Sequence, residues 1–201
     1  MKKQDFRHPK EKEAMLAIQR NPLFGMLSET LSQVLVGTPA LAESVARRFP
    51  VTRRSYPRLF DLYRDTLEKL DISEPYPLFL NFEYPLKAEA RGYGKSCVLT
   101  LNGNNLDLLT EPQIQVLLAH ELAHIQYDHL RYFSLFKALD TVGKYSISLL
   151  DTGLNALVSV FLDWMQAADY TADRVAAYVV GDRETVAEAI RLSMGTVPSI
   201  V

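Results

Sequence analysis

The chain has 201 residues, 48% of them hydrophobic and 23% charged, which is ordinary for a soluble globular protein with a sizeable core. Its formal net charge of −2 argues against the strongly basic surface that binds nucleic acid or anionic membranes. The single cysteine, Cys97, excludes an intrachain disulfide and is consistent with a reducing compartment.

The amino-terminal part of the chain, residues 1–55, is predicted to be a helical extension. Residues 1–13 are polar and lack the apolar core of a secretory signal. Residues 10–48 are predicted to be helical, with a break near the Gly-Thr-Pro sequence at residues 37–39. We assign the remainder, residues 56–201, to one main domain.

The main domain opens with a predicted helix over residues 56–70. Its apolar residues share one face, namely Leu59, Phe60, Tyr63, Leu67 and Leu70. Two strand-like runs follow at residues 78–82 and 97–101, and the chain reads as helical again from about residue 111. The predicted fold class is therefore α+β, mostly helical, with a small β-sheet.

The helix that begins near residue 111 carries clear start signals. Thr110 suits the N-cap position, and Gln113 three residues later completes a capping-box pattern. Pro112 lies in the first turn, where its missing N–H costs little. This helix is predicted to run to about Leu130.

Two more helices are predicted towards the carboxyl terminus. One covers residues 163–180 and ends at Gly181, and Asp182 then caps a last helix that ends near Gly195. The preceding apolar stretch, residues 134–164, is interrupted by Lys137, Asp140, Lys144, Asp151 and Asp163. Because a membrane-spanning helix needs about 20 mostly apolar residues, we expect no stable membrane span and a cytoplasmic protein.

Four of these charged residues fall on one helical stripe, namely Lys137, Asp140, Lys144 and Asp151. The plainer interpretation is a core helix with a narrow solvated face. The other interpretation is a lid or a dimer contact, which leaves a homo-oligomer open.

The sequence His120-Glu121-Leu122-Ala123-His124 is an HExxH motif on a predicted helix. Four residues advance a helix by about 400°, so the two imidazoles project from one face and reach one metal ion. Zinc lowers the pKa of a bound water to about 7, and Glu121 is the candidate base for its proton. The pattern also arises by chance, but the apolar neighbours predict a buried helix, where such polar side chains need partners.

A catalytic zinc needs a third protein ligand. His129 is the nearest candidate, but it lies about 140° round the helix from His124, and we interpret it as a surface or supporting histidine. Asp169 and Asp173 share a helical face, so one can bind the metal while the other accepts a hydrogen bond from a ligand imidazole. The alternative is a solvated acidic face or an ion pair with Arg174.

Two segments together resemble the HtpX-like zinc metallopeptidases of the gluzincin group. The first is residues 106–124, which lead into and include the HExxH motif. The second is residues 168–174, Ala-Asp-Tyr-Thr-Ala-Asp-Arg, similar to the second signature of that family. The resemblance covers about residues 56–195 and implies a zincin-like metallopeptidase domain, with its small sheet beside the active-site helix.

The resemblance also implies a role for each candidate residue. His120, His124 and Asp169 would hold Zn²⁺, Glu121 would be the catalytic base, and Asp173 would orient a histidine. The family has glutamate where this chain has Asp169, and aspartate is one methylene shorter. The ligand helix must therefore lie closer to the metal, or a water must intervene.

The expected function is a zinc-dependent metalloendopeptidase that hydrolyses peptide bonds in proteins or peptides through a zinc-activated water. The departure at Asp169 leaves an alternative, a catalytically weak or inactive metal-binding, chaperone-like protein of the same fold. A third interpretation is a helical interaction module in which HExxH is accidental. Metal content distinguishes the third from the others, and turnover of unfolded protein distinguishes the first from the second.

Overall fold

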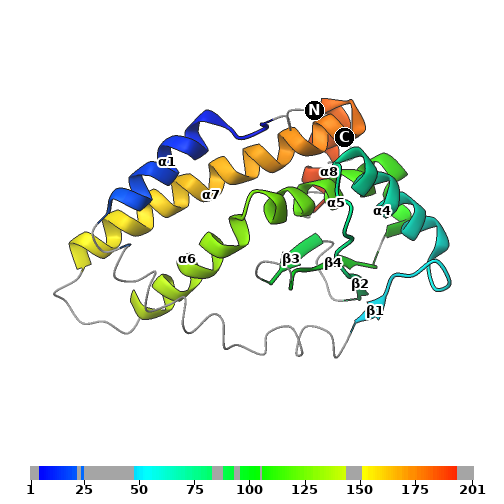
Figure 1. The fold of residues 1–201 in the computed structure, drawn as a ribbon, viewed down its shortest axis with the longest axis horizontal. Coiled ribbons are helices and arrows are strands. Elements are labelled where there is room, and N and C mark those ends of the chain that lie inside the picture. Colours follow the sequence, from blue (N-terminus) through cyan, green and yellow to red (C-terminus); the bar gives the residue numbers. More distant parts are fainter. Residues whose placement is uncertain are drawn as a thin grey trace, which may run out of the picture. The chain divides into compact units, whose positions relative to one another are not determined.

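The structure is a computed structural model. It describes residues 5–21, 24, 48–82, 88–92, 96–104, 106–143 and 151–193. The chain divides into two compact units, residues 1–39 with 128–171 and residues 40–127 with 172–201. Helix α7 (Asp151–Val180) includes residues of both units. Figure 1 draws it as one continuous helix. The helices of the described part include none that is long and apolar enough to cross a membrane.

The second unit is built on a four-stranded sheet. Its elements are β1 (Phe49–Pro50), α4 (Pro57–Lys69), β2 (Leu78–Asn81), β3 (Ala88–Arg91), β4 (Val98–Asn102), the 3₁₀ turn η1 (Leu106–Leu108), α5 (Glu111–Gln126) and α8 (Arg183–Ser193). The strand order is β1-β2-β4-β3, with β2 and β4 parallel and the two edge strands antiparallel to their neighbours.

One face of this sheet packs against α5. Successive side chains of a strand alternate between the two faces of a sheet. The strand register therefore brings alanines and leucines of β2, β3 and β4 together on the same face. The aligned buried residues are Leu78, Leu80, Ala88, Ala90, Leu99 and Leu101. Helices α4 and α8 also contact α5. Helix α5 is thus the buried centre of the unit, which explains why nine of its residues are buried.

The predicted α+β class is confirmed, and so are its two strands, which appear as β2 and β4. Strands β1 and β3 were not predicted. The sequence of β3 is Ala-Glu-Ala-Arg, which has little intrinsic preference for a strand. These residues form a strand because they pair with β4, with Ala88 opposite Leu101 and Ala90 opposite Leu99.

The start of α5 follows the predicted capping box. The hydroxyl of Thr110 accepts from the Gln113 N–H at 3.4 Å, and the Gln113 side chain accepts from the Thr110 N–H at 2.9 Å. The predicted end at Leu130 is wrong, because α5 ends at Gln126 and a new helix, α6 (His129–Gly143), follows. Asp128 breaks the helix with φ of 60°, a left-handed conformation that aspartate tolerates better than most residues.

The last two helices are α7 and α8. Helix α7 begins at Asp151, twelve residues before the predicted start, and ends at Val180 as expected. Gly181 follows with φ of +74°, which glycine adopts without steric cost. The Asp182 carboxylate accepts from the backbone N–H groups of Glu184 and Thr185, so its predicted role as the cap of α8 is confirmed.

The first unit contains α1 (Pro9–Arg20), α6 and the amino-terminal part of α7. Its apolar core draws on all three helices and comprises Met15, Ile18, Leu135, Leu157, Phe161, Trp164 and Ala168. The helix predicted over residues 10–48 is confirmed only for its first part. The remainder, including the break near residues 37–39, lies outside the described residues.

A buried polar cluster completes this unit. The carboxylate of Glu11 on α1 is fully buried and contacts His129 Nε2 at 3.2 Å. The Thr171 hydroxyl of α7 donates to the other carboxylate oxygen, and an Arg7 nitrogen lies 3.7 Å from Glu11. His129 is itself fully buried. Of the two predicted roles for His129, surface or supporting histidine, the surface role is therefore wrong. Glu11 supplies the partner that a buried imidazole needs.

Acid should weaken this unit through Glu11. Burial raises the pKa of Glu11, but hydrogen bonds from His129 and Thr171 and the nearby Arg7 leave it below its ordinary value. Such a carboxyl stabilises the folded state fully above its unfolded pKa, about 4.3, and loses that contribution as pH falls through the folded pKa. We expect Glu11→Gln to lower Tm at about pH 7 and to differ less from wild type below about pH 4. A Tm difference that does not change with pH, followed by circular dichroism, would contradict this assignment.

Candidate metal centre

Helix α5 brings the two histidines of the HExxH motif together. The Nε2 atoms of His120 and His124 are 3.0 Å apart, and the ring centroids are 4.7 Å apart. His124 is buried and His120 is half-buried. The spacing of four residues thus produces the shared face that the sequence predicts.

Asp173 on α7 contacts the far side of one imidazole. Its Oδ1 atom lies 2.9 Å from His120 Nδ1. Because a carboxylate accepts, Nδ1 carries the hydrogen, and in the neutral ring Nε2 is left with a lone pair. That lone pair faces His124. A carboxylate behind a histidine in this way is typical of metal-binding imidazoles.

Asp169 lies one helical turn before Asp173 on the same continuous helix. Its carboxylate and the ring nitrogens of His120 and His124 all lie within 4.8 Å of one another. The Asp169 side chain is exposed. These three residues are the set that the sequence predicts as metal ligands, and their proximity is compatible with that role.

The donor set fits a zinc ion. Zinc takes histidine nitrogens and carboxylate oxygens at about 2.0–2.2 Å in tetrahedral geometry, which sets neighbouring ligand atoms about 3.3 Å apart. The 3.0 Å between the two Nε2 atoms is close to that value. A cation between them would use both lone pairs, whereas two unprotonated nitrogens would repel.

Glu121 is held by the edge strand of the sheet. Its Oε2 atom accepts a hydrogen bond from the backbone N–H of Ala90 in β3 at 2.6 Å. Sequence reasoning missed Ala90, because it missed β3. The sequence signal for β3 is weak. It consists of two alanines, at 88 and 90, upstream of the predicted strand at 97–101. The alanines at 88 and 90 are buried on a strand that contacts α5.

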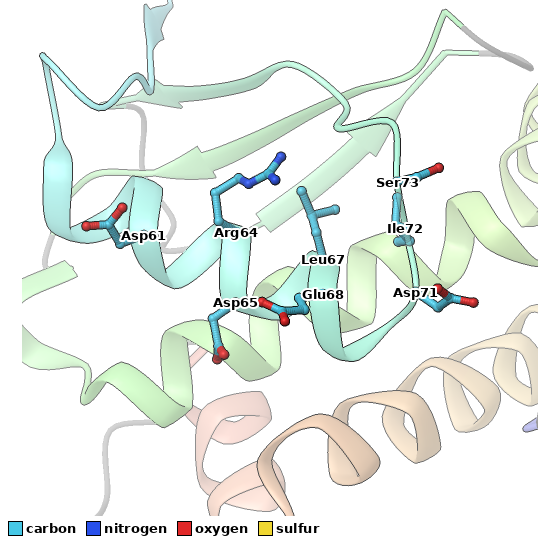
Figure 2. A pocket seen from close by; sticks show the side chains of 8 residues that line it. All are labelled: Asp61, Arg64, Asp65, Leu67, Glu68, Asp71, Ile72 and Ser73. Carbon is cyan, nitrogen blue, oxygen red and sulfur yellow. The ribbon is translucent and has the colours of Figure 1, made fainter.

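A surface cavity of about 450 Å³ lies elsewhere in the second unit, on α4 and the turn that follows it (Figure 2). Its lining is Asp61, Arg64, Asp65, Leu67, Glu68, Asp71, Ile72 and Ser73. Two of its carboxylates form ion pairs, Asp61 with Arg53 and Asp65 with Lys69. None of the candidate metal-site residues lines it, and we assign it no role in the chemistry.

Comparison with known proteins decides the family. Residues 86–196 match Peptidase family M48, a stretch that is more than half of the chain and includes every candidate site residue. The chain belongs to peptidase family M48. The family assignment supports a metallopeptidase and agrees with the resemblance of the motifs at that level. It does not separate an HtpX-like group from the rest of M48.

A curated relative agrees with the M48 assignment. It is the Plastoglobule-localized metallopeptidase 48, chloroplastic, of Arabidopsis thaliana. The two sequences are 26% identical over 197 residues, which cover 98% of this chain and 57% of the relative. The chain thus spans a little over half of the length of that relative. No solved structure matches the chain.

Proposed function

We propose that this M48 chain is an HtpX-like zinc metalloendopeptidase that hydrolyses peptide bonds in proteins or peptides. One observation carries the proposal. The HExxH helix places two imidazoles 3.0 Å apart, a carboxylate orients one of them, and a second carboxylate lies within 4.8 Å of both. This is the two-histidine, one-carboxylate donor set of a catalytic zinc that keeps a fourth position open.

Each residue of the site has its own role in the proposed hydrolysis. His120, His124 and Asp169 would hold the metal, which when bound would supply a Lewis acid and lower the pKa of water. Glu121 accepts the proton of the attacking water and delivers it to the leaving amine. The Ala90 N–H fixes the Glu121 carboxylate, and Asp173 accepts from Nδ1 of His120, so that Nε2 would be available to the metal.

The second candidate function is a metal-binding, chaperone-like protein with weak or no hydrolysis. The observation that favours it is Asp169, which is exposed and lies in a cluster whose ligand atoms are within 4.8 Å of one another. That limit is wider than the separation of about 3.3 Å between zinc ligands. A carboxylate that reaches the metal poorly would bind zinc less tightly and activate water less.

Metal analysis combined with a cleavage assay distinguishes the two functions. We expect purified protein to contain about one zinc per chain and to cleave unfolded casein, with cleavage lost after chelation. Zinc without cleavage, at a concentration of casein that saturates binding, would favour the chaperone-like function. Absence of zinc after supplementation would overturn both and leave the HExxH motif without a metal role.

A further inference from the structure

We propose that α1 is a positioning element for the metal site, acting through a clamp formed by Glu11 and Thr171. The clamp fixes the rotation of α7 about its own axis, and thereby the direction in which Asp169 points. The proposal rests on the proposed function, since Asp169 is assigned to the metal there. It adds a role for a segment that lies outside the M48 match at residues 86–196.

Two residues of the amino-terminal segment, His8 and Glu11, form hydrogen bonds with the Thr171 hydroxyl. The Thr171 hydroxyl donates to the Glu11 carboxylate and accepts from the His8 backbone N–H at 2.8 Å. The His8 ring packs edge-on against the next side chain, Tyr170, at 5.3 Å between centroids. His8 also caps α1, because its Nδ1 accepts from the Lys10 N–H at 3.3 Å. The clamp therefore ties the start of α1 to two consecutive residues of α7.

Thr171 lies midway between the two carboxylates of the second signature. Two residues along a helix correspond to about 200° of rotation, so Thr171 projects from the side of α7 opposite to Asp169. A hydrogen bond on that side resists rotation of the helix in either direction. Asp169 is carried by the same helix, so the rotation of α7 sets which positions its carboxylate can reach.

The hydrogen bonds of the clamp are shielded from water. Glu11, Thr171 and His129 are all fully buried, and His129 Nε2 lies 3.2 Å from Glu11. Removing the Thr171 hydroxyl would leave a buried carboxylate short of a donor and the His8 N–H short of an acceptor. Buried polar groups without partners are costly. The local structure would therefore shift to find new partners, and α7 would shift with it.

The test compares two substitutions at one position. Thr171→Val keeps the branched shape and deletes the hydroxyl, whereas Thr171→Ser keeps the hydroxyl. We expect Thr171→Val to weaken zinc affinity about 10–100-fold, as for other residues that orient a ligand, and Thr171→Ser to stay near wild type. Zinc affinity is measured by chelator competition, at a temperature where circular dichroism shows each variant folded. Absorption of bound Co²⁺ reports whether the ligand geometry changes.

Leu135→Ala is the matched control, because it opens a cavity in the core of the same unit without touching the clamp. It should lower Tm at least as much as Thr171→Val while zinc affinity and the Co²⁺ spectrum stay unchanged. The proposal is overturned if Thr171→Val binds zinc as wild type does, or if Leu135→Ala loses as much affinity. Wild-type protein that binds zinc but cleaves nothing refutes the peptidase function alone, and the comparison of variants still supports the clamp. Wild-type protein that binds no zinc overturns both.

Discussion

Glu121→Gln protein should bind zinc as tightly as wild type and hydrolyse casein about 10²–10⁴ times more slowly. Glutamine keeps the shape of the side chain and still accepts the hydrogen bond from the Ala90 N–H. It cannot take a proton from water, and general-base catalysis contributes a factor of this size. The measurement is the casein cleavage rate at saturating zinc, with the zinc content of each sample determined in parallel.

Glu111→Gln is the matched control for this substitution. Glu111 lies in the first turn of the same helix, where its side chain is exposed and pairs with Arg58. Loss of an exposed ion pair changes stability little, so its activity should equal that of wild type. A Glu121→Gln protein that retains near-normal turnover would refute the role of Glu121 as the base.

Asp169→Ala should weaken zinc binding by more than about 100-fold, which exceeds the loss of about 10–100-fold expected for a residue that only orients a ligand. Asp173→Ala should stay within the smaller range, because it removes the partner of His120 Nδ1 rather than a metal bond. Asp169→Glu should be tolerated, since it restores the ligand that the resembling HtpX-like family has at this position. Chelator competition measures all three affinities.

Asp163→Ala provides the baseline for this series, as an exposed aspartate on the same helix. If Asp173→Ala loses the metal and Asp169→Ala keeps it, the two roles are exchanged and the peptidase function survives. If both variants bind zinc like the Asp163→Ala protein, the acidic pair on α7 has no part in the site.

Local signals predicted the parts of the site that one helix determines. The spacing of His120 and His124 is enough to place their nitrogens together, because the helix repeat is fixed by backbone geometry. The N-cap of α5 at Thr110 and the end of α7 at Gly181 were also predicted correctly from local sequence. The acidic pair on α7 could be recognised as a shared face, but only the fold brings Asp173 to His120.

Features that depend on distant partners were not predictable. Strand β3 exists because β4 offers it hydrogen bonds, and its own residues give no strand signal. Helical phase set His129 apart from the metal ligands and left it as a surface or supporting histidine, but α5 ends at Gln126 and Asp128 adopts a left-handed conformation. That break changes the phase, and a carboxylate 118 positions away, Glu11, makes the burial of His129 possible.

Titration of zinc into chelator-stripped protein, with casein hydrolysis followed throughout, tests the central claim most directly. Hydrolysis should rise with added zinc and reach its plateau at about one ion per chain. Glu121→Gln protein should bind the same one ion and stay inactive. Hydrolysis that persists in metal-free protein, or zinc that binds without any hydrolysis by wild type, would contradict a zinc peptidase.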